Sequence, residues 1–215
     1  MTTAGDALYV GCYVDDLFIL YLQDGADSLY ASFTHKLAQR WEVEDEGEVT
    51  DLLNIEISRQ GASVTLRQTG YITKLAREWF PQGPPANVQL SSVPHPEDIR
   101  ELVIHATSEG APPPDQTLVN DYRKLVGALL YAATSTRPDI AYATSMLCRA
   151  MSKPTDLLMT AALRVLAYLS RHKHVGLRYT PCAQPLEGFT DADWAVRHSQ
   201  SGFLFRLGRA AVSWG

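Results

Sequence analysis

The sequence predicts an α+β fold, because two kinds of hydrophobic periodicity occupy different parts of the chain. Near both ends, apolar and polar residues alternate in short runs, which is typical of half-buried β-strands. Elsewhere apolar residues recur every three or four positions over stretches long enough for amphipathic helices. A proline-rich segment separates the two structured regions, since eight of the twelve prolines lie in residues 81–114.

The region before the prolines is predicted to contain two β-hairpins, each followed by a helix. The first turn is placed on the acidic pair Asp15 and Asp16, and the second on Gln60 and Gly61. The expected elements, in order, are strands 8–10 and 17–22, a helix over 27–41, strands 53–57 and 64–66, and a short helix over 70–79.

The region after the prolines is predicted to be helical first and stranded afterwards. Helices are expected over residues 119–133, 140–151 and 156–170, and strands over 187–194, 203–207 and 210–214. The stretch between the two regions shows no periodic apolar pattern of large residues. We therefore expect it to be an extended or mobile linker.

Charge is distributed unevenly along the 215 residues. The net charge of −5 argues mildly against a nucleic-acid partner. However, residues 1–60 carry 12 acidic and 3 basic side chains, whereas residues 121–180 carry 9 basic and 3 acidic ones. An acidic half beside a basic half suits an enzyme that holds a polyanion near divalent cations, although many unrelated proteins share this feature.

Other classes of protein are disfavoured by composition. No run approaches the roughly 18 apolar residues of a membrane span, so we expect no membrane partner and an intracellular, soluble chain. The cysteines Cys12, Cys148 and Cys182 lack the paired spacing of a zinc site or a disulfide framework. We expect them to be buried free thiols.

The acidic pair is the first candidate for chemistry. Two adjacent carboxylates disfavour joint ionisation unless a cation offsets their charges, so Asp15 and Asp16 are candidate ligands of a divalent metal. On local physics alone an ordinary solvated turn explains the same two residues, because aspartate is common in turns. Both interpretations remain open at this level.

The tetrad Tyr13–Asp16 (YVDD) resembles the Tyr-X-Asp-Asp signature of the reverse transcriptase palm hairpin. The segments that follow are similar, in the same order, to Pol polyproteins of copia-type LTR retrotransposons. They are residues 41–48 and 53–57, where Asn54 stands in place of the usual glycine and Glu46 in place of the usual leucine, and then residues 66–72 (LRQTGYI), 122–131 (YRKLVGALLY), 136–140 (TRPDI) and 164–169 (RVLAYL).

The last segment resembles the opening strands of the retrotransposon RNase H domain. Its motif is residues 188–195 (GFTDADWA), in which Asp191 matches the first catalytic carboxylate. Asp191 and Asp193 are predicted to share one face of a strand, which could hold a metal, although a solvated strand end would look the same. We assign the metal role to Asp191 and much less weight to Asp193.

The resemblance implies a fragment of an RNA-directed DNA polymerase with ribonuclease H activity. Asp15 and Asp16 would bind Mg²⁺ or Mn²⁺, and Tyr13 and Val14 would lie under the nascent base pair. The implied partners are an RNA template, a DNA primer, the RNA/DNA hybrid, deoxynucleoside triphosphates and the rest of a Pol polyprotein. The implied location is a virus-like particle in the cytoplasm, with the nucleus as an alternative.

The resemblance also implies a division of the chain. Residues 1–80 correspond to part of the palm and thumb, residues 81–118 to the linker, residues 119–180 to a helical thumb or connection region, and residues 181–215 to the first strands of an RNase H-like sheet.

We expect the chain alone to be inactive, since the family's upstream palm aspartate and later RNase H acids have no counterpart in it. The first alternative is a non-catalytic nucleic-acid-binding or interaction protein, whose basic helices touch phosphates. The second is a fragment without a stable fold.

Overall fold

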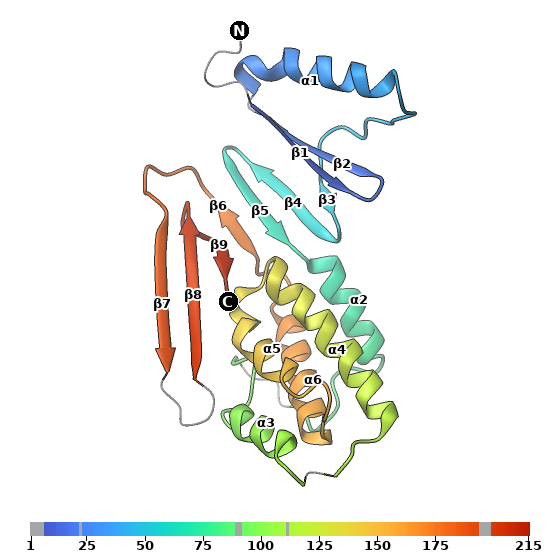
Figure 1. Cartoon of the computed structure of the whole chain (residues 1–215), viewed down its shortest axis with the longest axis vertical. Helices are drawn as coiled ribbons and strands as arrows, with labels where there is room; N and C mark the ends of the chain where they lie inside the picture. Colours follow the sequence, from blue (N-terminus) through green and yellow to red (C-terminus); the bar gives the residue numbers. More distant parts are fainter. Residues whose placement is uncertain (1–6, 22, 89–91, 111, 194–198) are drawn as a thin grey trace. The chain divides into compact units, whose positions relative to one another are not determined.

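The computed structural model describes residues 7–21, 23–88, 92–110, 112–193 and 199–215, and it divides the chain into two compact units, Met1–Val49 and Thr50–Gly215 (Figure 1). Both units combine strands with helices, which confirms the predicted α+β class. Each unit is treated separately below. The assignment of palm, linker, thumb and RNase H segments stays a prediction.

The first unit is a β-hairpin followed by a helix. Its elements are β1 (Leu8–Tyr13), β2 (Asp16–Tyr21) and α1 (Gln23–Ala38). Tyr21 of β2 stacks on Tyr30 of α1 with ring centroids 4.9 Å apart, and the Tyr30 hydroxyl donates to Asp45 Oδ2 at 2.6 Å. This hydrogen bond is the main reason why the pKa of Asp45 is lowered. The helix begins and ends earlier than predicted, and Leu22 lies outside the described residues.

The second unit contains a helical layer and two antiparallel sheets (Figure 1). The first sheet has the order β3-β4-β5-β6, and the second is the meander β7-β8-β9. The strands are β3 (Asp51–Leu52), β4 (Ile55–Gln60), β5 (Ser63–Arg67), β6 (Leu177–Tyr179), β7 (Glu187–Asp193), β8 (Gln200–Leu207) and β9 (Ala210–Trp214). The helices are α2 (Thr69–Trp79), α3 (Ile99–Thr107), α4 (Gln116–Ser135), the 3₁₀ turn η1 (Pro138–Ile140), α5 (Ala141–Cys148) and α6 (Asp156–Arg171).

Turn chemistry explains one departure of the sequence from the family pattern. Leu52 pairs with Ile55, so Leu53 and Asn54 form a two-residue turn, with φ of 54° and 62°. A turn with positive φ at both central residues favours glycine or asparagine, because both tolerate the left-handed region. Asn54 therefore replaces the family's glycine without changing the hairpin.

The helices enclose the main hydrophobic core. α4 and α6 contribute most of it, and their buried side chains follow the helical repeat that the sequence predicted. Fully buried examples are Leu125, Leu129, Leu158, Leu166 and Leu169. In the described part of the chain, no helix is long and apolar enough to cross a bilayer. The three cysteines are free, but Cys12 and Cys182 are exposed rather than buried as expected.

The proline-rich stretch is not a structureless linker throughout. It contains α3, whose residues Ile99, Val103 and Ala106 are buried in the main core, together with Val88. Apolar residues recur every three or four positions in this short helix, but the surrounding prolines favoured the prediction of a linker. This segment therefore differs from the expected linker because an amphipathic helix of about two and a half turns is enough to dock on α5 and α6.

A buried arginine ties the ends of the helices together. The Arg137 side chain is fully buried and binds Asp139 through Nε–Oδ1 (2.9 Å) and Nη2–Oδ2 (2.7 Å). Its Nη1 donates to the carbonyl of His172, which follows α6, at 3.0 Å. The Tyr168 hydroxyl donates to Asp139 Oδ2 at 2.9 Å. Burial alone raises the pKa of Asp139, but the hydrogen bonds and charge of Arg137, with the Tyr168 hydroxyl, outweigh it, so the pKa is lowered.

Asp139→Asn should lower the free energy of unfolding of the second unit by about 3 kcal/mol at pH 7, because it leaves a buried guanidinium without its counter-charge. A carboxyl whose pKa is depressed by folding stabilises above its ordinary pKa, and this contribution disappears as the pH falls below about 4. The difference between wild type and variant in urea denaturation should therefore shrink from pH 5 towards pH 3. The control is exposed Asp121→Asn, and an equal effect of both variants would contradict the role of the pair.

Candidate functional site

The acidic pair lies at the tip of the β1–β2 hairpin. Tyr13 pairs with Asp16, so the connecting turn consists of Val14 and Asp15. The predicted turn at Asp15 and Asp16 was therefore wrong by one residue, because the ladder continues to Asp16, which begins β2. Asp15 belongs to the turn, whereas Asp16 is the end residue of a strand, in which successive side chains point to opposite faces.

Val14 adopts an unusual backbone conformation. Its φ is 55°, whereas Asp15 does not share a positive φ, which is the sign pattern of a type II′ turn. Glycine normally occupies this first turn position, because a β-branched residue in the left-handed region is strained by roughly 1–3 kcal/mol. Strain of this kind is concentrated at functional sites, which supports a role for the tip beyond closing the hairpin.

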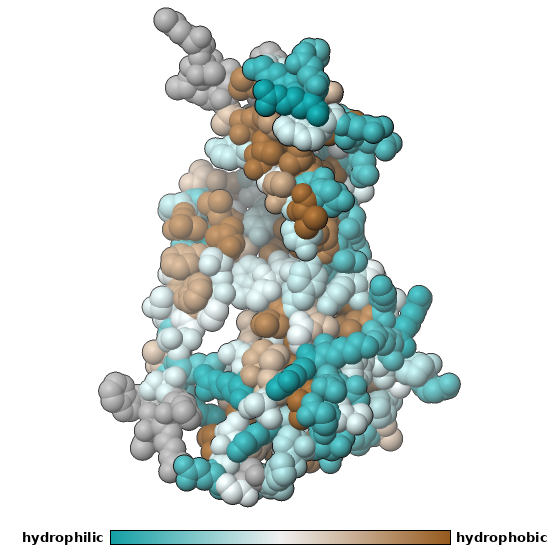
Figure 2. Space-filling model, turned by 45° about the vertical axis from the view of Figure 1, so that its right-hand side comes forward, coloured by the Kyte–Doolittle hydropathy of each residue, from teal (hydrophilic) through white to brown (hydrophobic). Residues whose placement is uncertain are grey.

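The tip is exposed, and in the described part of the first unit no basic side chain pairs with it. Tyr13 and Val14 are 56% and 84% exposed, and both aspartates are exposed. Within the described residues, no ion pair or hydrogen bond reaches either carboxylate group. Figure 2 shows hydrophobic side chains gathered in the upper part of the view, over the unit that carries the hairpin. Exposed apolar residues of its strands include Tyr9, Val10, Leu17 and Leu20.

The donor set fits part of a magnesium site. Mg²⁺ is bound in proteins by one or two carboxylates, with water and substrate phosphates completing the shell. Asp15 and Asp16 supply two such groups, and both are exposed. A search of the described residues finds no group of three or more His, Cys, Asp or Glu side chains able to hold a metal. The hairpin therefore provides at most two protein ligands.

Asp191 and Asp193 lie on β7, in the second unit, and they differ in their hydrogen bonds and ion pairs. Asp191 pairs with Gly202, and its Oδ1 accepts only the neighbouring amide of Ala192, at 2.9 Å. Asp193 accepts the amide of Gln200 at 2.7 Å and forms an ion pair with Arg100 at 2.7 Å. The pKa of Asp193 is lowered first by the Gln200 amide and then by Arg100. Trp194 and Ala195 of the same motif lie outside the described residues.

Comparison with known proteins decides the family. The retrovirus-related Pol polyprotein from transposon RE2 of Arabidopsis thaliana is 32% identical over 214 residues, which cover 96% of this chain and 14% of that polyprotein. An uncharacterized mitochondrial protein of the same plant is 30% identical over 212 residues, covering 96% of this chain and 82% of its own length. A putative transposon Ty5-1 protein of Saccharomyces cerevisiae is 27% identical over 219 residues, covering 99% of this chain and 67% of its own length.

The chain belongs to the copia-type retrotransposon Pol family. It spans a small part of the full Pol polyproteins that it matches, 14% for RE2. No family model matches it, and no solved structure matches it.

The Pol-like motifs of the second unit contact one another. The Thr136 hydroxyl donates to Gln68 Oε1 at 2.8 Å, and both side chains are buried. The Tyr71 hydroxyl donates to the Ala128 carbonyl at 3.0 Å, while the Tyr131 hydroxyl donates to the Leu53 carbonyl. These residues, with Arg137 and Asp139, hold elements together. The longest Pol-like motifs therefore carry structure, and the sequence analysis had assigned none of them a chemical role.

Sequence reasoning missed Arg100, which lies in the expected linker. A signal was available, because Ile99, Leu102, Val103 and Ala106 have the spacing of one helical face. A helix placed there would have identified Arg100 as a polar residue at its start. Nothing in the sequence, however, pairs it with a residue 93 positions away.

Val14→Gly should stabilise the hairpin by about 1 kcal/mol, because glycine adopts the positive φ without strain. Hydrogen exchange of the β1 and β2 amides should slow roughly fivefold. Val10→Gly is the matched control, since the same change inside β1 removes a strand-forming side chain and should speed exchange. Faster exchange in both variants would show that Val14 is not strained.

Proposed function

We propose that this chain is part of an RNA-directed DNA polymerase with ribonuclease H, which copies RNA into DNA by two-metal phosphoryl transfer. The observation that carries the proposal is the hairpin tip, where two adjacent, exposed carboxylates, unpaired within the described part of the first unit, follow a strained Val14. The likeness to Pol polyproteins supports the same assignment. The proposed substrates are an RNA template, a DNA primer and deoxynucleoside triphosphates.

Each residue of the tip has a proposed task. Asp15 and Asp16 hold Mg²⁺ or Mn²⁺ with their carboxylate oxygens at the primer terminus, and Tyr13 and Val14 line the floor under the nascent base pair. The bound cations stabilise charge on the attacking and leaving oxygens of the displacement. Asp191 is the corresponding acid of the ribonuclease H segment, which acts on the RNA strand of the hybrid. The site of action is proposed to be a virus-like particle in the cytoplasm.

We also propose that the chain alone has no catalytic activity. Two-metal phosphoryl transfer uses carboxylates from separate elements, whereas the hairpin contributes a single turn. In the described ranges, no third acid joins either acidic site. The missing ligands would come from the rest of a Pol polyprotein.

The purified chain should therefore give no extension of a DNA primer on an RNA template, with either Mg²⁺ or Mn²⁺. Added to the other segments of a Pol polyprotein, it should support extension, and Asp15→Asn should reduce that activity by at least a hundredfold, because a metal ligand is removed. Glu109→Gln, which removes an exposed carboxylate outside the hairpin, is the control and should leave the activity unchanged. Extension by the isolated chain that disappears in Asp15→Asn would refute the proposed inactivity.

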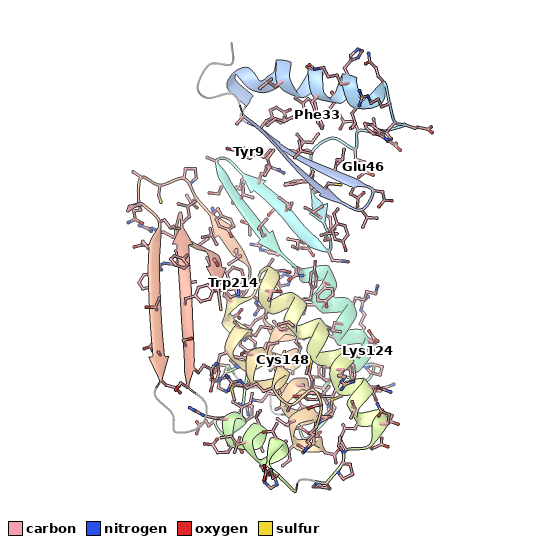
Figure 3. All side chains as sticks on the ribbon, viewed as in Figure 1. Tyr9, Phe33, Glu46, Lys124, Cys148 and Trp214 are labelled. Carbon is pink, nitrogen blue, oxygen red and sulfur yellow. The ribbon has the colours of Figure 1, made fainter. Side chains whose placement is uncertain are left out.

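A second candidate function, non-catalytic binding of nucleic acid, is favoured by the outward face of α4. This face has two basic side chains, Arg123 and Lys124, and Lys124 lies on the outer side of the helix (Figure 3). Its partner Glu78 forms an exposed ion pair of the kind that contributes little and exchanges readily. The exposed residues of α4 from Asn120 onwards are Asn120, Asp121, Arg123, Lys124, Gly127, Leu130 and Thr134, of which two are basic and one is acidic.

Gly127 lies in the centre of that face. A glycine inside a helix costs about 1 kcal/mol relative to alanine, yet a Cβ at this position would meet no atom within 4 Å. Packing within the chain therefore does not require the glycine. A ligand backbone that approaches the helix closely would require it.

Gly127→Ala should raise the free energy of unfolding by about 0.5–1 kcal/mol and weaken binding of an RNA/DNA hybrid roughly tenfold. Fluorescence anisotropy at several salt concentrations checks the binding. Arg123→Ala and Lys124→Ala should each reduce by about 1 the slope of the logarithm of the binding constant against the logarithm of the salt concentration. Ser145→Ala, on the exposed side of α5, is the control and should leave binding unchanged. Unaltered binding by Gly127→Ala would rule out this face.

A further inference from the structure

The sheet β7-β8-β9 is fixed to the rest of the second unit mainly along β9. Trp214 Nε1 donates to the Ala133 carbonyl at the end of α4 (2.8 Å), and Figure 3 shows Trp214 beside this helix. The Tyr179 hydroxyl of β6 donates to the Ala211 carbonyl at 2.6 Å. By contrast, β7 is the outer strand, and all of its residues after Glu187 are exposed. Packing alone therefore gives little support to the strand that carries Asp191.

An ion pair and a hydrogen bond of Asp193 hold the far end of β7. Arg100 Nη1 lies 2.7 Å from Asp193 Oδ2, and the other carboxylate oxygen accepts the Gln200 amide at 2.7 Å. Asp193 and Gln200 form the last pair of the β7–β8 ladder. A single carboxylate thus joins the last residue of β7, the first residue of β8 and α3.

The location of Arg100 indicates that this contact is not incidental. Arg100 is the second residue of α3, where the positive end of the helix dipole disfavours a cation. An arginine at this position gains nothing from the helix itself. Its side chain is 32% exposed, so it is held partly against the protein rather than extended into water.

We infer that Arg100 is a positioning residue: through Asp193 it latches the end of β7 onto α3 and so holds Asp191 in place. Asp191 and Asp193 share one face of the strand, about 7 Å apart along it. Their tasks are divided. Asp193 is committed to the latch and is not a metal ligand, whereas Asp191 keeps its oxygens available for the cation. Only this last role rests on the proposed function.

An exposed ion pair contributes at most about 1 kcal/mol, which is too little to decide global stability. It is enough to control local opening of a strand end, because such openings cost little free energy. The latch should therefore affect the β7–β8 end selectively. The β9 side of the sheet, which Trp214 anchors, should not respond.

Hydrogen exchange of the full chain, followed by NMR, tests the latch without any nucleic acid. Arg100→Met and Asp193→Asn should each speed exchange of the amides in residues 190–193 and 199–202 roughly fivefold. The effect of the double variant should be smaller than the sum of the two single effects, because both changes break the Arg100–Asp193 pair. Arg100→Lys keeps the charge and should retain most of the protection. Exchange at these amides that is unchanged in Arg100→Met, or equally raised along β9, would overturn the latch.

Broadening of NMR lines by Mn²⁺ tests which of the two carboxylates, Asp191 or Asp193, binds a cation. Broadening at the Asp191 and Ala192 amides should disappear in Asp191→Asn and persist in Asp193→Asn. Equal loss in both variants would make Asp193 a ligand and overturn the division of tasks. If the wild-type chain shows no broadening, the proposed ribonuclease role of Asp191 fails, while faster local exchange in Arg100→Met still supports the latch.

Discussion

The second unit depends on the buried guanidinium of Arg137. A fully buried arginine is costly unless it is paired and hydrogen-bonded, and here Asp139 and the His172 carbonyl accept a hydrogen bond from each of the three guanidinium nitrogens. These acceptors lie just after α4 and just after α6, so the charge can be satisfied only when both helices end in their native positions. The same two helices supply most of the core. Hydrophobic packing and the buried pair therefore specify one arrangement together.

This arrangement determines where the acidic residues of the second unit lie. The carbonyl of Ala133, near the end of α4, receives Trp214, and Trp214 fixes β9. The meander then extends outwards to β7, where each successive strand has less contact with the helices. Asp191 consequently lies on the least supported strand of the sheet. A contact from α3, the ion pair of Arg100 with Asp193, supports that end of the strand.

The sequence predicted those elements whose formation depends on local pattern. α6 was predicted to within one residue, and β9 with its observed limits, because each has a clear apolar repeat between polar turns. The three-residue β6 and the short α3 were missed, since their positions depend on β5 and on the core rather than on their own residues. The first turn was displaced by one residue, because a valine is not expected at positive φ. The sequence also could not predict that Asp15 and Asp16 are exposed and, within the described part of the first unit, unpaired. This depends on where the fold places its lysines and arginines.

The Pol-like motifs differ in what they can reveal about activity. Gln68, Tyr131, Thr136, Arg137 and Asp139 make contacts that any folded descendant of such a protein needs, whatever it binds. Their presence is therefore evidence for the fold and is neutral with respect to catalysis. Val14, Asp15 and Asp16 are different, because the hairpin gains nothing from a strained turn or from two uncompensated charges. These costly features, taken together, are therefore the stronger physical support for the proposed cation site at the tip.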